Sequence, residues 1–281
     1  MIPQDFEYSA PASLKEALEL IATGERKILA GGMSLIPLMK LRLAAPEHVV
    51  DLARVPGLDY ITESGGTVSI GATVTHHDLE SSPVIRGRAP LLAEAAGHIG
   101  DTQVRNMGTI GGSIAHADPA ADYPASLLAL EAQIRLVSAK SDRTVPASDF
   151  FLDAFTTAIE PGELVLEVLV PTEEPKEGYR YEKVAHPASG FAVVGVAARI
   201  KKAGAKISMA RIGVTGMSSR AFRALEAEKL LESGAGVAQA AATVAEGQEA
   251  NQDLYASADY RRHLARIWAA RALSVALSRA S

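Results

Sequence analysis

Two pairs of adjacent glycines are the residues of this sequence best suited to hold a ligand through the main chain. The first pair lies in the segment 30–34, Ala-Gly-Gly-Met-Ser, and the second in the segment 109–113, Thr-Ile-Gly-Gly-Ser. Paired glycines allow positive φ and let a ligand approach the backbone closely. Consecutive amides in such a turn form a concave site for an anion, and a helix N-terminus behind it adds a favourable dipole. With the hydroxyls of Ser34, Thr109 and Ser113, the two loops could hold the two phosphates of a dinucleotide.

Each glycine pair taken alone is equally typical of a tight turn. Neither loop has the G-x-G-x-x-G spacing of a Rossmann fingerprint or the G-x-x-x-x-G-K-[ST] spacing of a Walker loop. The sequence therefore excludes these two nucleotide-binding motifs, and the phosphate-binding interpretation depends on both loops acting together.

Other polar clusters support weaker interpretations. The segments 76–78, His-His-Asp, and 116–118, His-Ala-Asp, contain metal-ligand residue types, but a site needs three or four converging groups and both segments have simpler capping or loop roles. Ser113 with the second segment supplies the residue types of a hydrolase triad, without a nucleophile elbow around the serine. Arg105 fits either a phosphate contact or an ordinary salt bridge. We therefore predict no metal site and no catalytic acid or base.

Composition narrows the class of protein. The 281 residues are 48 % hydrophobic and 22 % charged, as in a folded globular protein, and the length is typical of two domains at about 100–200 residues each. The 28 basic and 33 acidic residues are scattered and give a formal net charge of −5, which argues against nucleic-acid binding. The absence of cysteine excludes disulfides, thiol nucleophiles and iron–sulfur ligation by this chain, so any redox chemistry must come from a bound cofactor. No apolar run reaches about 18 residues and the N-terminus lacks a secretory signal, which predicts no membrane span and a cytoplasmic location.

The order of elements predicts an α+β fold. We expect a two-lobed domain of mixed α/β character over residues 1–172, with lobes 1–55 and 56–172. A charged linker with two prolines follows at 171–178, and a second domain over 178–281 is expected to pack a three-stranded antiparallel sheet against helices.

Individual elements follow from capping and periodicity. Ser13 and Glu16 form a capping-box pattern that opens a helix reaching about Thr23, and a similar pattern starts at Thr75. The segment 98–113 is predicted to be a polar, glycine-rich loop outside the core. Expected strands are 27–30, 48–52, 67–72, 134–137, 164–170, 179–184, 191–200 and 206–215. Expected helices are 35–41, 91–97, 124–131, much of 220–250, and a terminal helix from 260 that aligns Leu264, Ile267, Trp268, Leu273 and Leu277 on one side.

Three segments carry a family resemblance: 29–37, LAGGMSLIP; 103–113, QVRNMGTIGGS; and 116–124, HADPAADYP. They resemble the FAD-binding medium subunit of molybdenum hydroxylases, in the carbon monoxide dehydrogenase type that is related to the flavin domain of xanthine dehydrogenase. The resemblance extends over nearly the whole chain.

The resemblance implies a set of FAD-binding positions. The segments 30–34 and 109–113 would wrap the pyrophosphate through main-chain amides. Asp122 would accept a hydrogen bond from a hydroxyl of FAD. Val165 and Leu166 would lie against the flavin ring, and Lys183 near its polar edge. Phe191 stands where many carbon monoxide dehydrogenase subunits have a tyrosine near the isoalloxazine, and Met33 where the loop often has His or Gln. The full expected set is Leu29, Ala30, Gly31, Gly32, Met33, Ser34, Leu35, Thr109, Ile110, Gly111, Gly112, Ser113, Asp122, Val165, Leu166, Lys183 and Phe191.

The resemblance also implies a function and partners. The chain would be an oxidoreductase subunit that takes electrons from the [2Fe–2S] clusters of a small subunit and passes them to an external acceptor. The substrate, left open among carbon monoxide, an aldehyde, a purine or an N-heterocycle, would be oxidised at a molybdenum cofactor in a large subunit, within a dimer of heterotrimers. Two alternatives stay open: a stand-alone FAD-dependent oxidoreductase, for which the short C-terminal part has no evident acid–base group, and a nucleotide-binding regulatory module.

Overall fold

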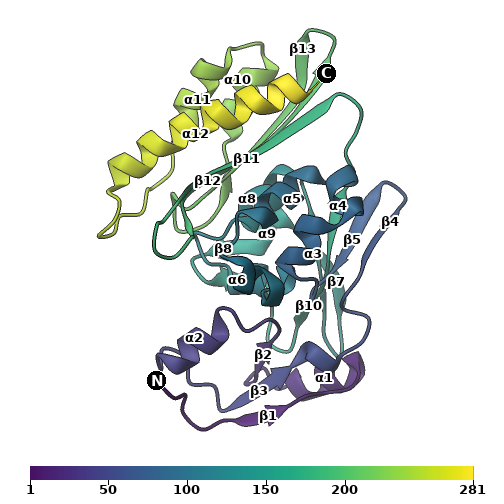
Figure 1. Ribbon diagram of the computed structural model, residues 1–281. Helices are drawn as coiled ribbons and strands as arrows, with labels where there is room; N and C mark the ends of the chain where they lie inside the picture. Colours follow the sequence, from purple (N-terminus) through teal and green to yellow (C-terminus); the bar gives the residue numbers. More distant parts are fainter. Residues whose placement is uncertain (281) are drawn as a thin grey trace.

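The computed structural model describes residues 1–280 and places three successive parts of the chain one above another (Figure 1). The N-terminal lobe lies at one end, a five-stranded sheet with its helices lies in the middle, and a four-stranded sheet with the long terminal helix lies at the other end. Helices and sheets thus mix in every part, and the predicted α+β class is confirmed.

The N-terminal lobe is a three-stranded parallel sheet in the order β1-β3-β2 with helices beside it. Its elements are β1 (Glu7–Ser9), α1 (Leu14–Ile21), β2 (Lys27–Leu29), α2 (Leu35–Lys40) and β3 (His48–Asp51). Ser13 caps α1 by accepting the amide of Glu16 at 3.2 Å, as its sequence pattern predicts. The Glu16 carboxylate accepts the amide of Ala12, one residue earlier than in a standard capping box. Ala17 and Ile21 of α1 are buried against Val50, which fixes the lobe's small core.

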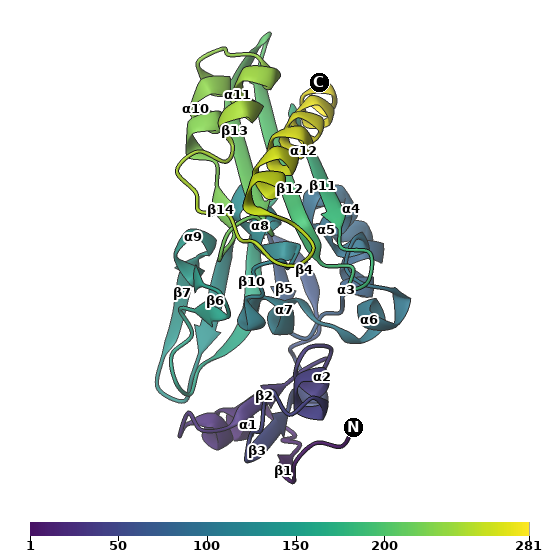
Figure 2. The ribbon, with the colours of Figure 1, turned by 90° about the vertical axis from the view of Figure 1, so that its left-hand side faces the viewer.

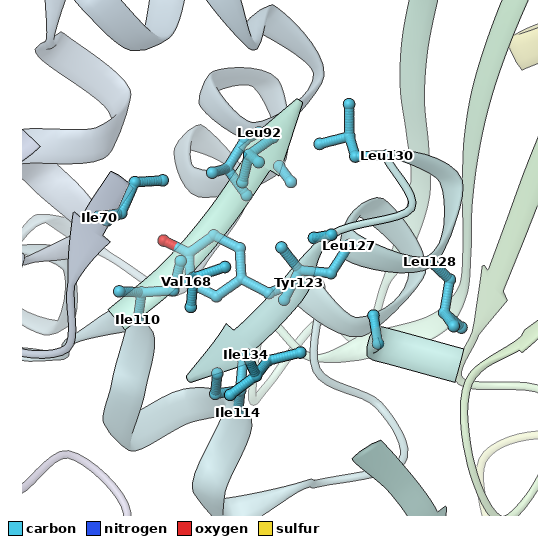
Figure 3. Close-up of a cluster of buried hydrophobic side chains, with 14 of the residues drawn as sticks. Ile70, Leu92, Ile110, Ile114, Tyr123, Leu127, Leu128, Leu130, Ile134 and Val168 are labelled. Atoms are coloured by element: carbon cyan, nitrogen blue, oxygen red, sulfur yellow. The ribbon is translucent and has the colours of Figure 1, made fainter. Parts of the chain in front are cut away.

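The middle of the molecule is an antiparallel sheet in the order β4-β5-β10-β6-β7. Its strands are β4 (Ile61–Ser64), β5 (Thr67–Gly71), β6 (Gln133–Val137), β7 (Asp142–Pro146) and β10 (Leu164–Pro171). The remaining elements are α3 (His76–Ser81), α4 (Pro83–Arg88), α5 (Pro90–Gly97), α6 (Thr102–Met107), α7 (Ile110–His116), α8 (Tyr123–Ala129), α9 (Ala147–Phe150), β8 (Phe151–Asp153) and β9 (Thr156–Thr157). Tyr123 lies at the centre of the largest core, among Ile110, Ile114, Leu127 and Val168 (Figure 3).

The prediction of a loop outside the core at 98–113 is wrong. This segment contains α6 and α7, and Ile110 and Gly111 are buried. Gly111 belongs in a helix here because α7 packs directly on Ala72: a Cβ at Gly111 would lie 2.6 Å from the Ala72 carbonyl oxygen. Close packing thus outweighs the poor helix propensity of the glycine pair.

The C-terminal part is an antiparallel sheet in the order β11-β12-β13-β14. Its elements are β11 (Glu177–Ala185), β12 (Ala192–Ala203), β13 (Lys206–Thr215), β14 (Phe222–Arg223), α10 (Leu225–Glu232), α11 (Val237–Thr243) and α12 (Ala258–Arg279). The two-residue β14 adds a fourth strand to the three that were expected. Helices α10, α11 and α12 cover one face of the sheet (Figures 1 and 2), and α8 packs against β13 so closely that a Cβ at Gly213 would lie 2.0 Å from the Ala125 carbonyl oxygen.

Two sequence expectations for this part need correction. Ile267 was expected on the packed side of the terminal helix but is 38 % exposed, whereas Arg261 is buried. The expected linker is shorter than 171–178, because β10 runs to Pro171 and β11 starts at Glu177, whose carboxylate forms a buried ion pair with Arg199 at 3.0 Å. Of the helices within residues 1–280, none is both long and apolar enough to cross a lipid bilayer.

Candidate cofactor site

The two glycine loops lie against each other. A Cβ at Gly31 would stand 1.8 Å from the carbonyl oxygen of Met107 and 2.8 Å from the Cα of Gly108, so the first loop touches the residues just before the second through bare backbone. A Cβ at Gly112 would stand 3.8 Å from the Cβ of Ala30. The first loop follows strand β2, and the second follows the end of α6. Together the two loops form one continuous backbone surface.

The first loop offers main-chain donors. Within residues 1–280, the N–H groups of Gly31, Gly32, Met33 and Ser34 donate to no protein acceptor. Gly32 has a φ of 75°, which turns the chain so that successive amides can face one side. A run of amides without protein acceptors at a surface needs water or a ligand, and an anion satisfies several of them at once.

The second loop does not offer its amides in the same way. The N–H groups of Ile110 and Gly111 donate to the carbonyl oxygens of Val74 and Ala72 at 3.0 and 2.9 Å. The N–H of Gly112 donates to the Thr109 hydroxyl oxygen at 3.1 Å, because Thr109 caps α7. The expectation that 109–113 binds through amides therefore differs from this geometry. The loop presents instead the half-buried side chain of Ser113 and, at exposed Gly112, a surface without a Cβ, whereas Thr109 is buried.

The pair Val165 and Leu166 lies beside the second loop. Leu166 is a bulge in β10, and its carbonyl oxygen accepts the N–H of Ala72 at 3.0 Å, the same residue whose carbonyl oxygen holds Gly111. Val165 is 5 % exposed and belongs to the central core, whereas Leu166 is half-buried and packs toward the N-terminal lobe. Of these two expected ring contacts, Leu166 is therefore the one with an accessible side chain.

A buried histidine supports the second loop from behind. The N–H of His76 donates to the Gly108 carbonyl oxygen at 2.9 Å, and His76 Nδ1 lies 2.9 Å from the hydroxyl of Tyr123. Burial, with a smaller contribution from the charge of Arg105, lowers the pKa of His76 to about 4, so the ring is neutral at pH 7. Sequence reasoning treated this residue as a capping or metal candidate and missed its supporting role, since nothing near it in the chain points to Tyr123.

A second group of expected residues converges around Asp122. One carboxylate oxygen of Asp122 accepts the Tyr181 hydroxyl at 2.5 Å, and the other accepts the Lys183 ammonium at 2.9 Å. The Lys183 ammonium also donates to the His98 carbonyl oxygen at 2.8 Å. The side chains of Lys183 and Asp122 are 1 % and 4 % exposed. Burial raises the pKa of Asp122 to about 6, and the Lys183 ammonium and the Tyr181 hydrogen bond oppose that rise.

Asp122 keeps some capacity for a further partner. A carboxylate oxygen can accept more than one hydrogen bond, so both oxygens retain acceptor capacity although each is already engaged. The family resemblance implies that Asp122 and Lys183 share one site, but it does not indicate that they pair. Asp122 lies directly before α8 and Lys183 lies in β11, and no local pattern joins these two parts of the fold.

Phe191 ends the turn between β11 and β12 and is 41 % exposed. The turn lies against the 98–101 segment, since a Cβ at Gly190 would stand 3.7 Å from the Cα of Gly100. The N–H of Ala192 donates to the Ala120 carbonyl oxygen at 3.1 Å, which ties the turn to the segment before Asp122. Phe191 therefore belongs to the Asp122 group. Along the chain, α6 connects the 98–101 segment of that group to the second glycine loop, and α7 connects this loop to the segment before Asp122.

The competing interpretations find no support in the geometry. Within residues 1–280, no group of His, Asp and Glu side chains is arranged to hold a metal ion. Asp118 accepts the N–H of Ala120 at 2.8 Å, and the His116 ring packs on Phe155 with centroids 5.1 Å apart. Arg105 pairs with Glu80 at 3.0 Å, which makes it an ordinary salt bridge.

Two known protein families match successive parts of the chain. Residues 4–173 match the family described as the FAD binding domain in molybdopterin dehydrogenase. The chain belongs to that family. Residues 179–276 of this family member match the C-terminal domain of carbon monoxide dehydrogenase flavoproteins. The family resemblance carried by segments 29–37, 103–113 and 116–124 is thus confirmed.

Individual relatives of this FAD-binding family member cover its full length. It is 42 % identical, over 99 % of both chains, to the carbon monoxide dehydrogenase medium chain of Hydrogenophaga pseudoflava. It is 39 % identical to subunit alpha of the 6-hydroxypseudooxynicotine dehydrogenase complex of Paenarthrobacter nicotinovorans, over 100 % of this chain and 97 % of the relative. A solved carbon monoxide dehydrogenase from Hydrogenophaga pseudoflava, which lacks the Mo-pyranopterin moiety of its cofactor, matches with a TM-score of 0.96 at 43 % identity, covering 100 % of each chain.

Proposed function

We propose that this chain is the FAD-containing electron-transfer subunit of a molybdenum-dependent dehydrogenase. It takes electrons from the [2Fe–2S] clusters of a small subunit and passes them to an external acceptor, while the substrate is oxidised at the molybdenum cofactor of a large subunit. The observation that carries the proposal is the meeting of the two glycine loops, one with unused amides and the other without a Cβ at its surface, inside a domain of the FAD-binding family.

The residues present fit a bound dinucleotide. The amides of Gly31–Ser34 would bind the pyrophosphate, and the hydroxyl of Ser113 would add a donor from the second loop. The exposed Gly112 would let the phosphates approach α7 closely, since it has no side chain of its own. When bound, flavin supplies the redox chemistry, because it exchanges electrons one at a time with a cluster and two at a time with an acceptor.

The Asp122 group would hold the other end of the cofactor. Asp122 would accept a hydrogen bond from a hydroxyl of FAD. The buried Lys183 ammonium stabilises the negative charge of that carboxylate. Leu166 and Phe191 would shield the ring from water on the two sides of the site. No side chain of this group needs to act as an acid or base on the substrate of the complex.

The partners follow from the same proposal. Relatives carry the printed names medium chain and complex subunit alpha, which support an assembly with a large and a small subunit. We propose a dimer of heterotrimers in the cytoplasm. Because full-length relatives are named for carbon monoxide and for 6-hydroxypseudooxynicotine, substrate choice would lie in the large subunit.

The purified chain tests the proposal through its colour and turnover. A yellow protein that dithionite bleaches, and that oxidises small molecules only negligibly by itself, supports the subunit function. Steady turnover of a small molecule by the isolated chain would instead make it a stand-alone oxidoreductase. A colourless preparation that binds other nucleotides would make it a regulatory module.

A pair of glycine variants tests the location of the cofactor. Gly112→Val places a side chain beside Ala30, where the pyrophosphate is proposed to lie, and should abolish FAD binding in a titration followed by flavin fluorescence. Gly87→Val is the matched control, because Gly87 also lies in a short helix but a Cβ there meets nothing within 4 Å. Equal FAD affinity in both variants would place the cofactor elsewhere.

A further inference from the structure

The turn that carries Phe191 is held by an unusual capping residue. The turn spans residues 186–191, His-Pro-Ala-Ser-Gly-Phe, between β11 and β12. Its ends are joined by the N–H of His186, which donates to the Phe191 carbonyl oxygen at 2.8 Å, and by the N–H of Gly190, which donates to the His186 carbonyl oxygen at 2.9 Å. These two bonds close the backbone but leave the amides in the middle of the turn without main-chain acceptors.

The imidazole of His186 satisfies those amides. The N–H groups of Ala188 and Ser189 donate to His186 Nδ1 at 3.2 and 3.3 Å. Pro187, which lies between His186 and Ala188, has no N–H, so the amides of Ala188 and Ser189 are the first two donors after the histidine. A ring nitrogen that accepts hydrogen bonds carries no proton, which requires the neutral tautomer with its proton on Nε2. The side chain therefore acts here as Asp or Asn does in an Asx turn.

The outer side of the imidazole is packed by a second segment. The ring of Tyr255 lies 4.4 Å from the His186 ring, centroid to centroid, at an interplanar angle of 59°. The Tyr255 N–H donates to Asp253, and Asp253 pairs with the buried Arg261. Arg261 in turn donates to the carbonyl oxygen of Val193, next to the turn, at 2.6 Å. The imidazole thus lies between its own turn and the segment of Tyr255, which Arg261 ties to the start of β12.

We infer that His186 is a positioning residue that fixes the 186–191 turn, and with it Phe191, at the edge of the cofactor site, and that protonation of its imidazole releases the turn. An imidazolium has no acceptor nitrogen, so a proton on Nδ1 replaces two hydrogen bonds with two opposed N–H dipoles. The role assigned to Phe191 beside the cofactor rests on the proposed function, whereas the cap itself does not.

The elements packed against the turn carry several titratable or charged groups. Tyr255 and Asp253 lie on the segment before α12, and Asp118 on the segment that binds Ala192. His98 and Asp101 flank Gly100, and the Lys183 ammonium binds the His98 carbonyl oxygen. Within residues 1–280, the hydrogen bonds of the His186 ring are the two from the turn amides.

Amide hydrogen exchange on the full chain without added FAD tests the cap. In His186→Ala, the protection of the Ala188 and Ser189 amides, corrected for intrinsic exchange, should fall about tenfold at about pH 8. The wild-type chain should lose the same protection in acid, because a proton on Nδ1 removes the acceptor. His186→Asn is the rescue variant, because its amide oxygen occupies the place of Nδ1 and does not titrate, so its protection should be the same in acid as at the higher pH. Protection that is unchanged in His186→Ala, or that falls equally with acid in His186→Asn, would overturn the inference.

A flavin measurement tests the link from the turn to the cofactor. Iodide quenching of bound flavin should increase in His186→Ala, and in the wild type in acid, but not in His186→Asn. If FAD binds to none of these proteins, the proposed function fails while the exchange result still decides the cap. If FAD binds and the quenching is identical in all three, the link between the turn and the cofactor is wrong.

Discussion

The carbonyl oxygen of Met107 occupies the space that a side chain at Gly31 would need. A Cβ there would stand 1.8 Å from that oxygen, and both partners are backbone, so neither can move aside without displacing a loop. This contact joins the N-terminal lobe to the helical segment of the middle part at the place where the proposed pyrophosphate site lies.

Gly31→Ala should therefore separate the two loops. We expect a loss of about 1–3 kcal/mol in the free energy of unfolding, the usual cost of overpacking, together with loss of FAD binding. Chemical unfolding and an FAD titration measure the two effects. Gly87→Ala is the control, since its Cβ meets nothing within 4 Å. Full FAD affinity in Gly31→Ala would show that the loops do not need to touch.

The neutral state of His76 makes the stability of the protein depend on pH. Its pKa is about 4 in the folded chain against 6.5 for the unperturbed side chain. As the pH falls, the unfolded state therefore binds the proton before the folded state does. The contribution of neutral His76 to the free energy of unfolding is about 3 kcal/mol. It is complete above about pH 6.5 and is lost as the pH falls toward about 4. His76→Asn should flatten this part of the profile in denaturant unfolding at a series of pH values. The exposed neighbour His77 supplies the control His77→Asn, which should keep the wild-type slope.

The buried pair of Lys183 and Asp122 predicts a pH-dependent cost of losing the cation. Asp122 has a folded pKa of about 6, above its ordinary 3.8, so its folded form retains a proton longer and its contribution to stability falls as the pH rises through this window. Lys183→Met leaves a buried carboxylate without a cation and should cost about 3–5 kcal/mol at about pH 8. The cost should be smaller at about pH 5, where Asp122 is protonated.

The double variant Asp122→Asn with Lys183→Met serves as the control for this pair. It removes both charges, so it should recover part of the stability lost at about pH 8 and should show little difference between the two pH values. Denaturant unfolding of the three proteins gives the comparison. An equal cost for Lys183→Met at both pH values would mean that the ammonium does not serve to neutralise Asp122.

Gly178 fixes the approach of the terminal helix to its sheet. A Cβ there would lie 2.1 Å from the carbonyl oxygen of Ala276 in α12. Gly178→Ala should lower the melting temperature and cost about 1–3 kcal/mol of stability, because helix and strand must move apart. Gly236→Ala, in the same part of the chain, has open space for its Cβ and should melt like the wild type. Identical melting of both variants would contradict the close packing.

Local patterns were sufficient to predict the strands β2, β3, β5, β6 and β10–β13 and several helix starts, but not β1, β4 or β7–β9. The alternation of Val68 and Ile70 with polar residues predicts β5, and Thr75 caps α3 as its sequence pattern indicates. The helix around Gly111 was missed because its reason is tertiary: only the contact with Ala72 explains a glycine there. Strand β7 was missed because Asp142–Pro146 is a polar edge strand with little alternation.

The candidate site was likewise predicted only in part from local sequence patterns. The glycine loops were predicted from their composition, but which loop keeps free amides depends on hydrogen bonds to Val74 and Ala72, which lie far away in the chain. The partners of Asp122 were likewise beyond sequence reasoning, because Tyr181 and Lys183 lie on β11 and approach Asp122 only when the C-terminal sheet packs on α8.

Strand β10 lies between β5 and β6 in the central sheet, yet it is the last of that sheet's strands to be synthesised. Gly71 of β5 pairs with Glu167, so a nascent chain that has not yet reached Leu164 holds the two flanking strands with an open slot between them. Pairings over such long stretches of chain close slowly, and exposed strand edges invite association with other molecules. The central sheet can therefore be completed only after most of the FAD-binding part has been synthesised, and until then β5 and β6 each keep an unpaired edge.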